Sequence, residues 1–331
     1  MSTINRRTLL AGAAATGALA AGAAIAQPDA FAKAPDLSGK SILITGCSSG
    51  FGRLAAEHFA RAGAKVFATM RRMPRAEADE LRMMALNEKL DMQVIEIDVT
   101  SDRSVDEGCK QALLASGGRI DVLINNAGIS YAGPIEIQDM DATRHLFETN
   151  VFGPHRMARA LLPAMREAGS GQIINVSSQL GRVIVPAYGQ YSPTKFALEA
   201  MSEQMAYELV PQNIDVTIIE PGGYPTEIWE NSQANTLELL GRADEAHLAG
   251  YGAMIEQLRA RSGGGGTTDP MDIPRAMAQV IAMPPGTRPL RRAVHPGTKP
   301  QLAINDLTAK VQVGWLGESG YGAWIKSVHN A

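Results

Sequence analysis

A tyrosine and a lysine lie four residues apart in the segment Tyr191-Ser192-Pro193-Thr194-Lys195. This spacing places both side chains on one face of a helix, provided that Pro193 falls in the first helical turn. A free tyrosine hydroxyl has a pKa of about 10, and a neighbouring ammonium group lowers that pKa by favouring the phenolate. The pair predicts a tyrosine that donates or accepts a proton in catalysis. Taken alone, the same spacing also fits an ordinary amphipathic helix.

A serine, Ser178, precedes Tyr191 by thirteen residues and follows a short β-rich run. Its hydroxyl can donate a hydrogen bond to a substrate oxygen on which negative charge grows as a hydride arrives. Ser178, Tyr191 and Lys195 together are therefore our candidate catalytic centre.

A glycine-rich segment follows the first apolar run and opens a helical stretch, with the sequence Thr45-Gly-Cys-Ser-Ser-Gly-Phe-Gly52. Glycines permit a tight turn and a close approach of the backbone to a pyrophosphate, and the N-terminus of the helix attracts that anion. A plain strand-to-helix turn would not need three glycines. The segment therefore predicts a dinucleotide-binding loop.

Short runs rich in Val and Ile alternate with helical stretches along the chain. They read as strands because they are apolar on both faces, as in a parallel sheet covered by helices. The expected strands are Ser41–Thr45, Lys65–Thr69, Gln93–Ile97, Asp121–Ile124, Gln172–Val176 and Asp215–Ile219, with a weaker seventh near Leu290–Val294. This alternation predicts an α/β fold: a single Rossmann-type, doubly wound parallel sheet of about seven strands with helices on both faces.

The motifs, taken together and in order, resemble the short-chain dehydrogenase/reductase family. They are Gly-x-x-x-Gly-x-Gly, Asp98-Val99-Thr100, Asn125-Asn126-Ala127-Gly128, Thr149-Asn150-Val151, Tyr191-x-x-x-Lys195 and Pro221-Gly222 with Thr226. The resemblance implies that Asp98 contacts adenine and that Lys195 also holds the nicotinamide ribose. It also implies that Asn150 is a fourth catalytic residue, which holds a water that relays protons, and that Thr226 binds the carboxamide. The interval of thirteen residues from Ser178 to Tyr191 is usual in the family.

These motifs, together with the end of the second expected strand, give the residues that we expect to bind the cofactor. They are Gly46, Ser48, Ser49, Gly50, Phe51, Gly52, Arg71, Asp98, Val99, Asn125, Ala127, Gly128, Tyr191, Lys195, Pro221, Gly222 and Thr226.

The end of the second expected strand indicates which nicotinamide dinucleotide binds. A protein that prefers NAD would carry an acidic residue there, to hold the ribose hydroxyls. Met70 stands at that position and Arg71 follows it. A guanidinium binds a phosphate through a planar fork of donors, and Ser48 could add a hydroxyl. The sequence therefore favours NADP over NAD, although Arg71 could instead be a solvated surface residue.

The composition excludes several other classes. The chain has 331 residues, a net charge of −3 and scattered basic residues, so nothing suggests a nucleic-acid partner. No cysteine–histidine cluster has the spacing of metal ligands, so we expect no metal. The two cysteines, Cys47 and Cys109, could form a disulfide, but two buried free thiols are the better interpretation.

The first residues read as an export segment. Arg6 and Arg7 precede an uncharged run rich in Ala and Gly, which resembles a twin-arginine signal. Cleavage is expected after Ala26, or alternatively after Ala32. Removal of residues 1–26 would leave a net charge of −5 and no transmembrane segment. An uncleaved membrane anchor and a disordered tail are the alternatives; we expect a periplasmic or otherwise exported protein, or else a cytoplasmic or membrane-tethered one.

The expected domain organisation is a linker over 27–38 and one oxidoreductase domain over 39–331. Its residues 224–270 would cover the substrate. The expected activity is NADP(H)-dependent hydride transfer to a carbonyl or from a secondary alcohol, with Tyr191 as general acid or base. The glycine-rich segment from Thr45 to Gly52, together with Ala68-Thr69-Met70-Arg71, resembles the branch of the family that includes hydroxysteroid and retinol dehydrogenases. This resemblance hints at a lipophilic substrate.

A reductase of another carbonyl class and a non-catalytic redox sensor remain alternatives. The family resemblance also implies a homo-oligomer formed through the helices that carry Asn150 and Tyr191.

Overall fold

The computed structural model describes residues 35–261 and 263–331. The expected signal segment over 1–26 therefore lies outside the described residues. The described residues form one compact unit. Leu37 belongs to the stretch expected as a linker, yet it is buried in the core and its backbone N–H donates to the carbonyl of Ala62 at 2.8 Å.

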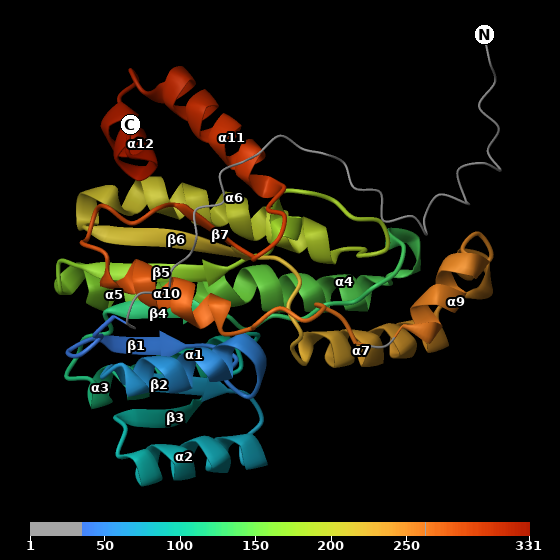
Figure 1. The fold of residues 1–331 in the computed structure, drawn as a ribbon, viewed down its shortest axis with the longest axis horizontal. Coiled ribbons are helices and arrows are strands. Elements are labelled where there is room, and N and C mark those ends of the chain that lie inside the picture. Colours follow the sequence, from blue (N-terminus) through green and yellow to red (C-terminus); the bar gives the residue numbers. More distant parts are fainter. Residues whose placement is uncertain (1–34, 262) are drawn as a thin grey trace. The chain divides into compact units, whose positions relative to one another are not determined.

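The seven expected strands form a single parallel sheet in the order β3-β2-β1-β4-β5-β6-β7, which confirms the predicted fold class (Figure 1). All six neighbouring pairs are parallel. The strands are β1 (Ser41–Ile44), β2 (Lys65–Met70), β3 (Met92–Glu96), β4 (Val122–Asn125), β5 (Gly171–Val176), β6 (Ile214–Pro221) and β7 (Arg291–Val294).

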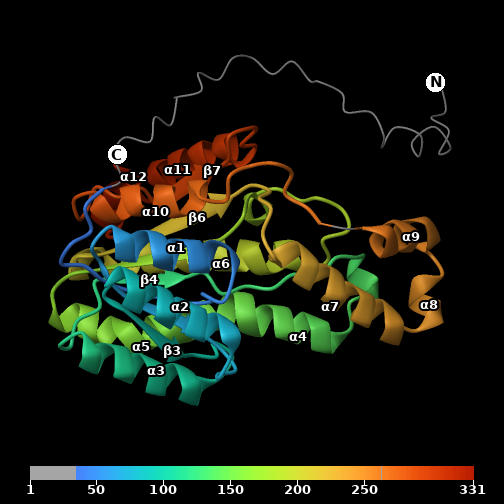
Figure 2. The same ribbon diagram turned by 60° about the horizontal axis from the view of Figure 1, so that its bottom comes forward.

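Buried side chains on the two faces of the sheet form two separate cores. One core packs the sheet against helices α1 (Gly50–Arg61), α2 (Ala76–Glu88) and α10 (Asp272–Ala282). The other packs it against helices α3 (Asp102–Ala115), α5 (Gly153–Glu167) and α6 (Tyr191–Leu209). Figures 1 and 2 show the two helical layers from different sides. The apolar runs predicted strands correctly because each strand is covered on both faces.

The chain order reverses at the centre of the sheet. β1 pairs with β2 on one side and with β4 on the other, so the chain is wound outward in both directions from this point. In open α/β sheets, ligands bind at the carboxyl ends of the strands near such a switch point. The loops that follow β1 and β4 are therefore the natural location of a ligand.

Further helical elements complete the fold around this sheet. They are η1 (Ile135–Ile137), α4 (Met140–Phe147), η2 (Glu148–Phe152), η3 (Gln179–Gly181), η4 (Val210–Gln212), α7 (Ile228–Arg242), α8 (Glu245–Leu248), α9 (Gly252–Ala260), α11 (Gln301–Leu316) and α12 (Gly322–His329). The helices α7 and α9 extend beyond the end of the sheet (Figure 1). They carry a small core of their own, in which Leu240, Ile255 and Leu258 pack with Ala132 and Ile137.

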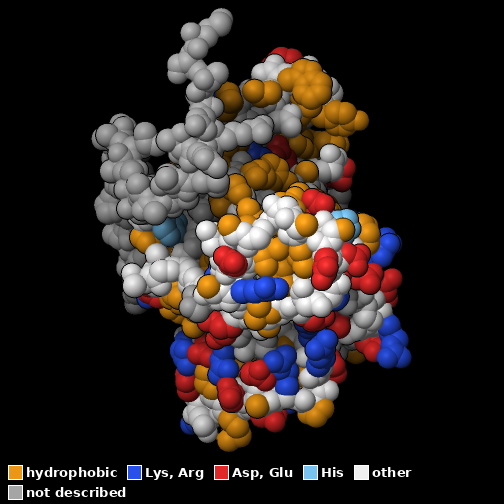
Figure 3. Space-filling view, turned by 90° about the vertical axis from the view of Figure 1, so that its right-hand side faces the viewer, with side chains coloured by type: hydrophobic (Ala, Val, Ile, Leu, Met, Phe, Trp, Pro, Cys, Tyr) orange, Lys and Arg blue, Asp and Glu red, His pale blue; other side chains and the backbone are white. Residues whose placement is uncertain are grey.

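Charged and hydrophobic side chains are unevenly distributed on the side of the molecule that carries α7 and α9 (Figure 3). Acidic and basic side chains are interspersed over its lower part, whereas hydrophobic side chains gather towards the top. Among the described residues, no helix is both long and apolar enough to cross a membrane.

Candidate active site

A cleft of about 590 Å³ lies at the carboxyl edge of the sheet. Its walls are the loops that directly follow β1 to β6, because parallel strands end at the same edge. Thirteen of the residues expected to bind the cofactor, together with Ser178, line it. They are Gly46, Ser48, Ser49, Gly50, Phe51, Arg71, Asp98, Val99, Ala127, Gly128, Pro221, Gly222 and Thr226. Tyr191 and Lys195 line it too, so the expected cofactor-binding residues and the expected catalytic residues lie in the same cleft.

The glycine loop brings two backbones close together at the switch point. Gly46 has a φ of +73°, and a Cβ atom there would lie 2.8 Å from the Cα of Ala127, in the loop after β4. A side chain at Gly46 would therefore separate the two loops. The backbone of Gly50 opens α1, and its N–H donates to Oε2 of Glu227 at 3.0 Å. A carboxylate thus already occupies an anion position at the N-terminus of this helix.

The far end of the cleft beyond β2 is positively charged. Arg71, Arg72 and Arg75 line it, with Asp98 from the loop after β3. Arg75 forms an ion pair with Glu77. Over residues 35–261 and 263–331, no acidic side chain lies within ion-pair distance of Arg71 or Arg72. Both still contribute to holding the pKa of Asp98 below its usual value, after the backbone and hydroxyl hydrogen bonds from Thr100.

The catalytic helix begins at Tyr191, so Pro193 falls in its first turn, as expected. Ser178 lies in the loop after β5, and its hydroxyl is hydrogen-bonded to the phenol of Tyr191. The Lys195 ammonium lies 5.7 Å from the centre of the Tyr191 ring and donates to the carbonyl of Val176 at 2.9 Å. The structure therefore brings all three expected catalytic side chains together at one point of the cleft.

The pKa of Tyr191 differs from the expectation. Desolvation raises the pKa of Tyr191 to about 12, although the hydrogen bond from Ser178 opposes the shift. Desolvation also lowers the pKa of Lys195 to about 8, while the charge of Glu199, one turn further along the helix, opposes that shift. The prediction that Lys195 lowers the tyrosine pKa is wrong for this structure, because burial disfavours both charged forms.

Asn150 does not line the cleft. It is buried in η2, a π-helical turn between α4 and α5. Its Oδ1 accepts from the N–H of Ile129 at 2.9 Å, and its Nδ2 donates to the carbonyl of Ile129 and to the hydroxyl of Thr194. Asn150 therefore ties the loop after β4 to the catalytic helix. π-Helical turns are often found at functional sites.

Two further residues expected to bind the cofactor lie behind the cleft wall. Asn125 is buried in β4, where its Nδ2 donates to Oδ1 of Asn175 at 2.8 Å. Gly52 packs against the carbonyl of Gly46 and the side-chain amide of Asn126, so a Cβ there would collide with both. Neither residue lines the cleft, whereas Asn126, which the sequence analysis did not select, does.

The segment after β6 contributes residues to the lining of the cleft. They include Thr226, Ile228, Trp229, Ser232 and Asn235. Tyr188 also lines the cleft, and its hydroxyl accepts a hydrogen bond from Arg261, which is not itself a lining residue, at 3.1 Å. Trp229 was not predicted as a site residue, since no local motif marks it.

Buried charges fix the far part of the catalytic helix. Arg291 of β7 forms ion pairs with Glu199 and Glu203, which lie one turn apart on α6. The hydroxyl of Tyr207 also donates to Glu203. All three charged side chains are nearly inaccessible to solvent, so loss of one partner would leave a buried charge uncompensated.

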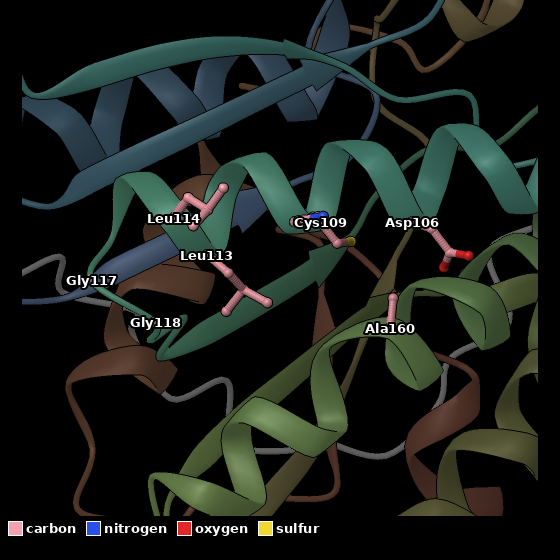
Figure 4. A pocket seen from close by; sticks show the side chains of 8 residues that line it. Asp106, Cys109, Leu113, Leu114, Gly117, Gly118 and Ala160 are labelled. Carbon is pink, nitrogen blue, oxygen red and sulfur yellow. The ribbon is translucent and has the colours of Figure 1, made fainter.

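A second hollow of about 470 Å³ lies between α3 and α5, away from these groups (Figure 4). Asp106, Leu113, Leu114 and Ala160 line it with Cys109. Burial raises the pKa of the Cys109 thiol to about 12, so the thiol is a poor nucleophile. Cys47 and Cys109 are both free and buried, as predicted. The part of the chain that the structure describes holds no group of three or more potential metal ligands.

The fold and the motif residues define a class of protein. A family comparison matches residues 40–237 to the short chain dehydrogenase family. The chain therefore belongs to the short-chain dehydrogenases/reductases, which are oxidoreductases that act on CH–OH groups.

Individual relatives support this assignment over most of the chain. An uncharacterized oxidoreductase of Bacillus subtilis, YusZ, is 35% identical over 81% of this chain and 93% of its own length. Bovine retinol dehydrogenase 8 is 33% identical over 80% of this chain and 84% of its own length. A short-chain dehydrogenase from Streptomyces avermitilis has a similar structure, with a TM-score of 0.64 and 32% identity over 84% of this chain and 96% of that chain.

Proposed function

We propose that this chain is an NADP(H)-dependent oxidoreductase that interconverts a ketone and a secondary alcohol. The observation that carries the proposal is the convergence of Ser178, Tyr191 and Lys195 beside the glycine loop, within one cleft. A redox sensor without turnover would have no use for a complete proton-transfer group.

The three side chains have distinct tasks in this proposal. The bound dinucleotide would exchange the hydride. Tyr191 holds its proton near neutral pH, because its pKa is raised to about 12, and donates it to the carbonyl oxygen during reduction. Ser178 donates a hydrogen bond to the same oxygen as negative charge develops there. Lys195 is held by the carbonyl of Val176, which keeps its charge next to the phenol.

Features at both ends of the cleft support the binding of a dinucleotide. The Gly46–Ala127 approach leaves the loop backbone open to a pyrophosphate, and Glu227 already places an anionic oxygen on the N–H of Gly50. At the adenosine end, Arg71 and Arg72 have no ion-pair partner among the described residues, and β2 ends without a carboxylate. A 2′-phosphate would complement this charge, which favours NADP over NAD.

The substrate end of the cleft favours a substrate with apolar surface. Leu180, Val185, Ile228 and Trp229 line the cleft, and the backbone N–H of Leu180 donates to the hydroxyl of Ser178. One relative is a retinol dehydrogenase, which agrees with a lipophilic carbonyl or alcohol.

A panel of ketones and secondary alcohols assayed with NADPH, NADP⁺, NADH and NAD⁺ tests the proposal. We expect turnover with NADPH and NADP⁺, and we expect Tyr191→Phe to lose this turnover. Dinucleotide binding without turnover of any panel member would instead support the sensor. Equal turnover by Tyr191→Phe would overturn the assignment of the tyrosine.

We further propose that the protein is exported with its cofactor already bound. Arg6 and Arg7 with the apolar run after them support this, and folded export would avoid the need to find NADP(H) outside the cytoplasm. Fractionation of cells, with mass measurement of the recovered protein, tests export. Recovery of only the full-length chain from the cytosol would contradict it.

We also propose that the protein assembles as a homo-oligomer through the helices that carry Asn150 and Tyr191. Family membership supports this assembly. Light scattering on the purified protein gives the molar mass directly, and the mass of a single chain would contradict the proposal.

A further inference from the structure

The helix that carries Tyr191 and Lys195 continues with a buried carboxylate at the same spacing. Glu199 follows Lys195 by four residues on α6, so the two side chains are neighbours on one face of the helix. Both are almost inaccessible to solvent, with 5% of Lys195 and 1% of Glu199 exposed. A buried carboxylate is costly unless it is paired, so the contacts of Glu199 indicate its role.

One group of contacts lies against the turn that holds Ser178. A Cβ atom at Gly181 would lie 3.0 Å from Cγ and 3.3 Å from Oε1 of Glu199, so the Glu199 side chain packs directly on the backbone of Gly181. The N–H of Gly181 donates to the carbonyl of Ser178 at 2.9 Å, and the N–H of Leu180 donates to the hydroxyl of Ser178 at 3.1 Å. Glu199 therefore supports η3, the short turn whose backbone binds both oxygens of Ser178.

The other contact joins the carboxylate to the sheet. Nε of Arg291, on β7, donates to Oε2 of Glu199 at 2.8 Å and lies 3.8 Å from Oε1 of Glu220 on β6. Glu220 directly precedes Pro221 and Gly222, which line the cleft. Through Arg291, the Glu199 carboxylate is therefore held in a fixed position relative to the strand that carries this part of the cleft.

The charge of Glu199 acts on the ammonium of Lys195. The carboxylate opposes the lowering of the Lys195 pKa that burial causes, and it is the one charged group of the described residues that shifts this pKa. The other charged side chains packed around Glu199 belong to different elements and include Arg182, Glu203, Glu220 and Arg291. Lys195 itself faces one further titratable group, the phenol of Tyr191.

We infer that Glu199 is a positioning residue for the reaction, which holds the turn that carries Ser178 and keeps a negative charge beside Lys195. This inference rests on the proposed function. Glu199 does not line the cleft, so it acts through these two residues and does not touch the substrate. Glu203, one turn further along α6, also pairs with Arg291, at 2.5 Å, but it lies two turns from Lys195.

Glu199→Gln and Glu203→Gln form a matched pair of variants, since each removes one negative charge beside Arg291 and keeps the size of the side chain. Steady-state rates with NADPH and the best ketone of the panel give kcat and KM. Because small displacements of catalytic groups are costly, we expect kcat to fall roughly tenfold or more in Glu199→Gln and less than about twofold in Glu203→Gln, with KM changed less than about threefold in both. Urea unfolding should show that both variants lose stability, since both disturb the same buried ion pairs.

The pH profile of kcat/KM is a readout that a merely structural ion pair would not change. Without the Glu199 charge, burial lowers the pKa of Lys195 further, so the ammonium loses its proton at lower pH. The alkaline limb of the profile for ketone reduction should therefore move to lower pH in Glu199→Gln and stay in place in Glu203→Gln. Glu199→Asp keeps the charge and should keep the limb, but with a reduced kcat because its shorter side chain withdraws from Gly181.

Equal kcat values and equal pH profiles in the two Gln variants would overturn the inference. An unchanged kcat in Glu199→Asp would overturn it as well, and this variant decides the question if Glu199→Gln does not fold. The proposed function fails separately, if the unsubstituted protein binds NADPH but turns over no member of the panel.

Discussion

The ammonium of Lys195 lies 5.7 Å from the ring centre of Tyr191, one helical turn further along the same face of α6. The backbone carbonyl of Val176 fixes that ammonium from the adjacent strand, β5. The helix and the sheet therefore jointly define the position of the charge relative to the phenol. Because both groups are desolvated, the pair has an uncharged tyrosine ready to donate a proton near neutral pH.

Replacement of Tyr191 by Phe should remove the proton donor with little effect on the fold. The ring remains, and only the hydroxyl that bonds to Ser178 is lost. We expect turnover to fall by roughly 10²- to 10⁴-fold, which is typical of a positioned acid or base. Steady-state rates with NADPH and the best ketone of the panel check the loss. A dissociation constant for NADPH within about threefold of the original shows that the cleft is intact; full activity in the variant would refute the assignment.

Replacement of Lys195 by Met should change how stability depends on pH. The folded pKa of Lys195 is about 8, below its value of about 10.5 in an unfolded chain. Below pH 8 both states are protonated, so the folded state bears the full cost of the buried charge. Between pH 8 and 10.5 the folded state releases the proton first, which relieves that cost. Relative to the variant, the unsubstituted protein should gain about 2 kcal/mol of unfolding free energy between pH 7 and 9.5.

Urea unfolding at several pH values between 7 and 9.5 measures this difference. The range stops below pH 10, where ionisation of tyrosines in the unfolded state begins to contribute. Lys310→Met is a suitable control, since Lys310 is exposed on α11 and pairs with Asp306. A constant stability difference across the range would contradict the lowered pKa.

The sheet could be predicted from the sequence because each strand is a short apolar run between polar turns. Even the weak seventh run, near Leu290–Val294, is a strand that pairs with β6. The glycine loop and the residues after Pro221 could be placed for the same reason, since parallel strands bring their following loops to one edge.

The remaining parts of the site depend on packing that no local pattern records. Trp229 lines the cleft from α7, and α9 packs against α7 through contacts such as that between Gln233 and Leu258. Asn125 and Gly52 belong to recognisable motifs, yet Asn125 bonds to Asn175 of β5 and Gly52 packs against Gly46 and Asn126, so neither lines the cleft. The tyrosine pKa was predicted with the wrong sign because a sequence gives the neighbouring charge but not the degree of burial.

Replacement of Arg71 by Ser should shift the cofactor preference. Arg71 directly follows β2, lines the cleft and has no ion-pair partner in the described part of the chain. We expect the dissociation constant of NADPH to rise roughly tenfold or more, because a charge-assisted contact with the 2′-phosphate is lost. The constant for NADH should change by less than about threefold. Titration of both dinucleotides measures this, with Arg82→Ser on the exposed side of α2 as control; equal losses for both dinucleotides would mean that Arg71 does not read the phosphate.

Replacement of Glu227 by Gln should strengthen cofactor binding. The Glu227 carboxylate accepts from the N–H of Gly50 at the start of α1, where a phosphate of the dinucleotide would also bind. Two anions cannot share this position without repulsion, so the carboxylate must move before the cofactor binds. A charge at a helix N-terminus is worth about 0.3–1 kcal/mol, so we expect the dissociation constants of NADPH and NADH to fall together by roughly two- to fivefold. The neighbouring exposed Glu230→Gln serves as control; unchanged constants in Glu227→Gln would show that its contact with Gly50 does not compete with the cofactor.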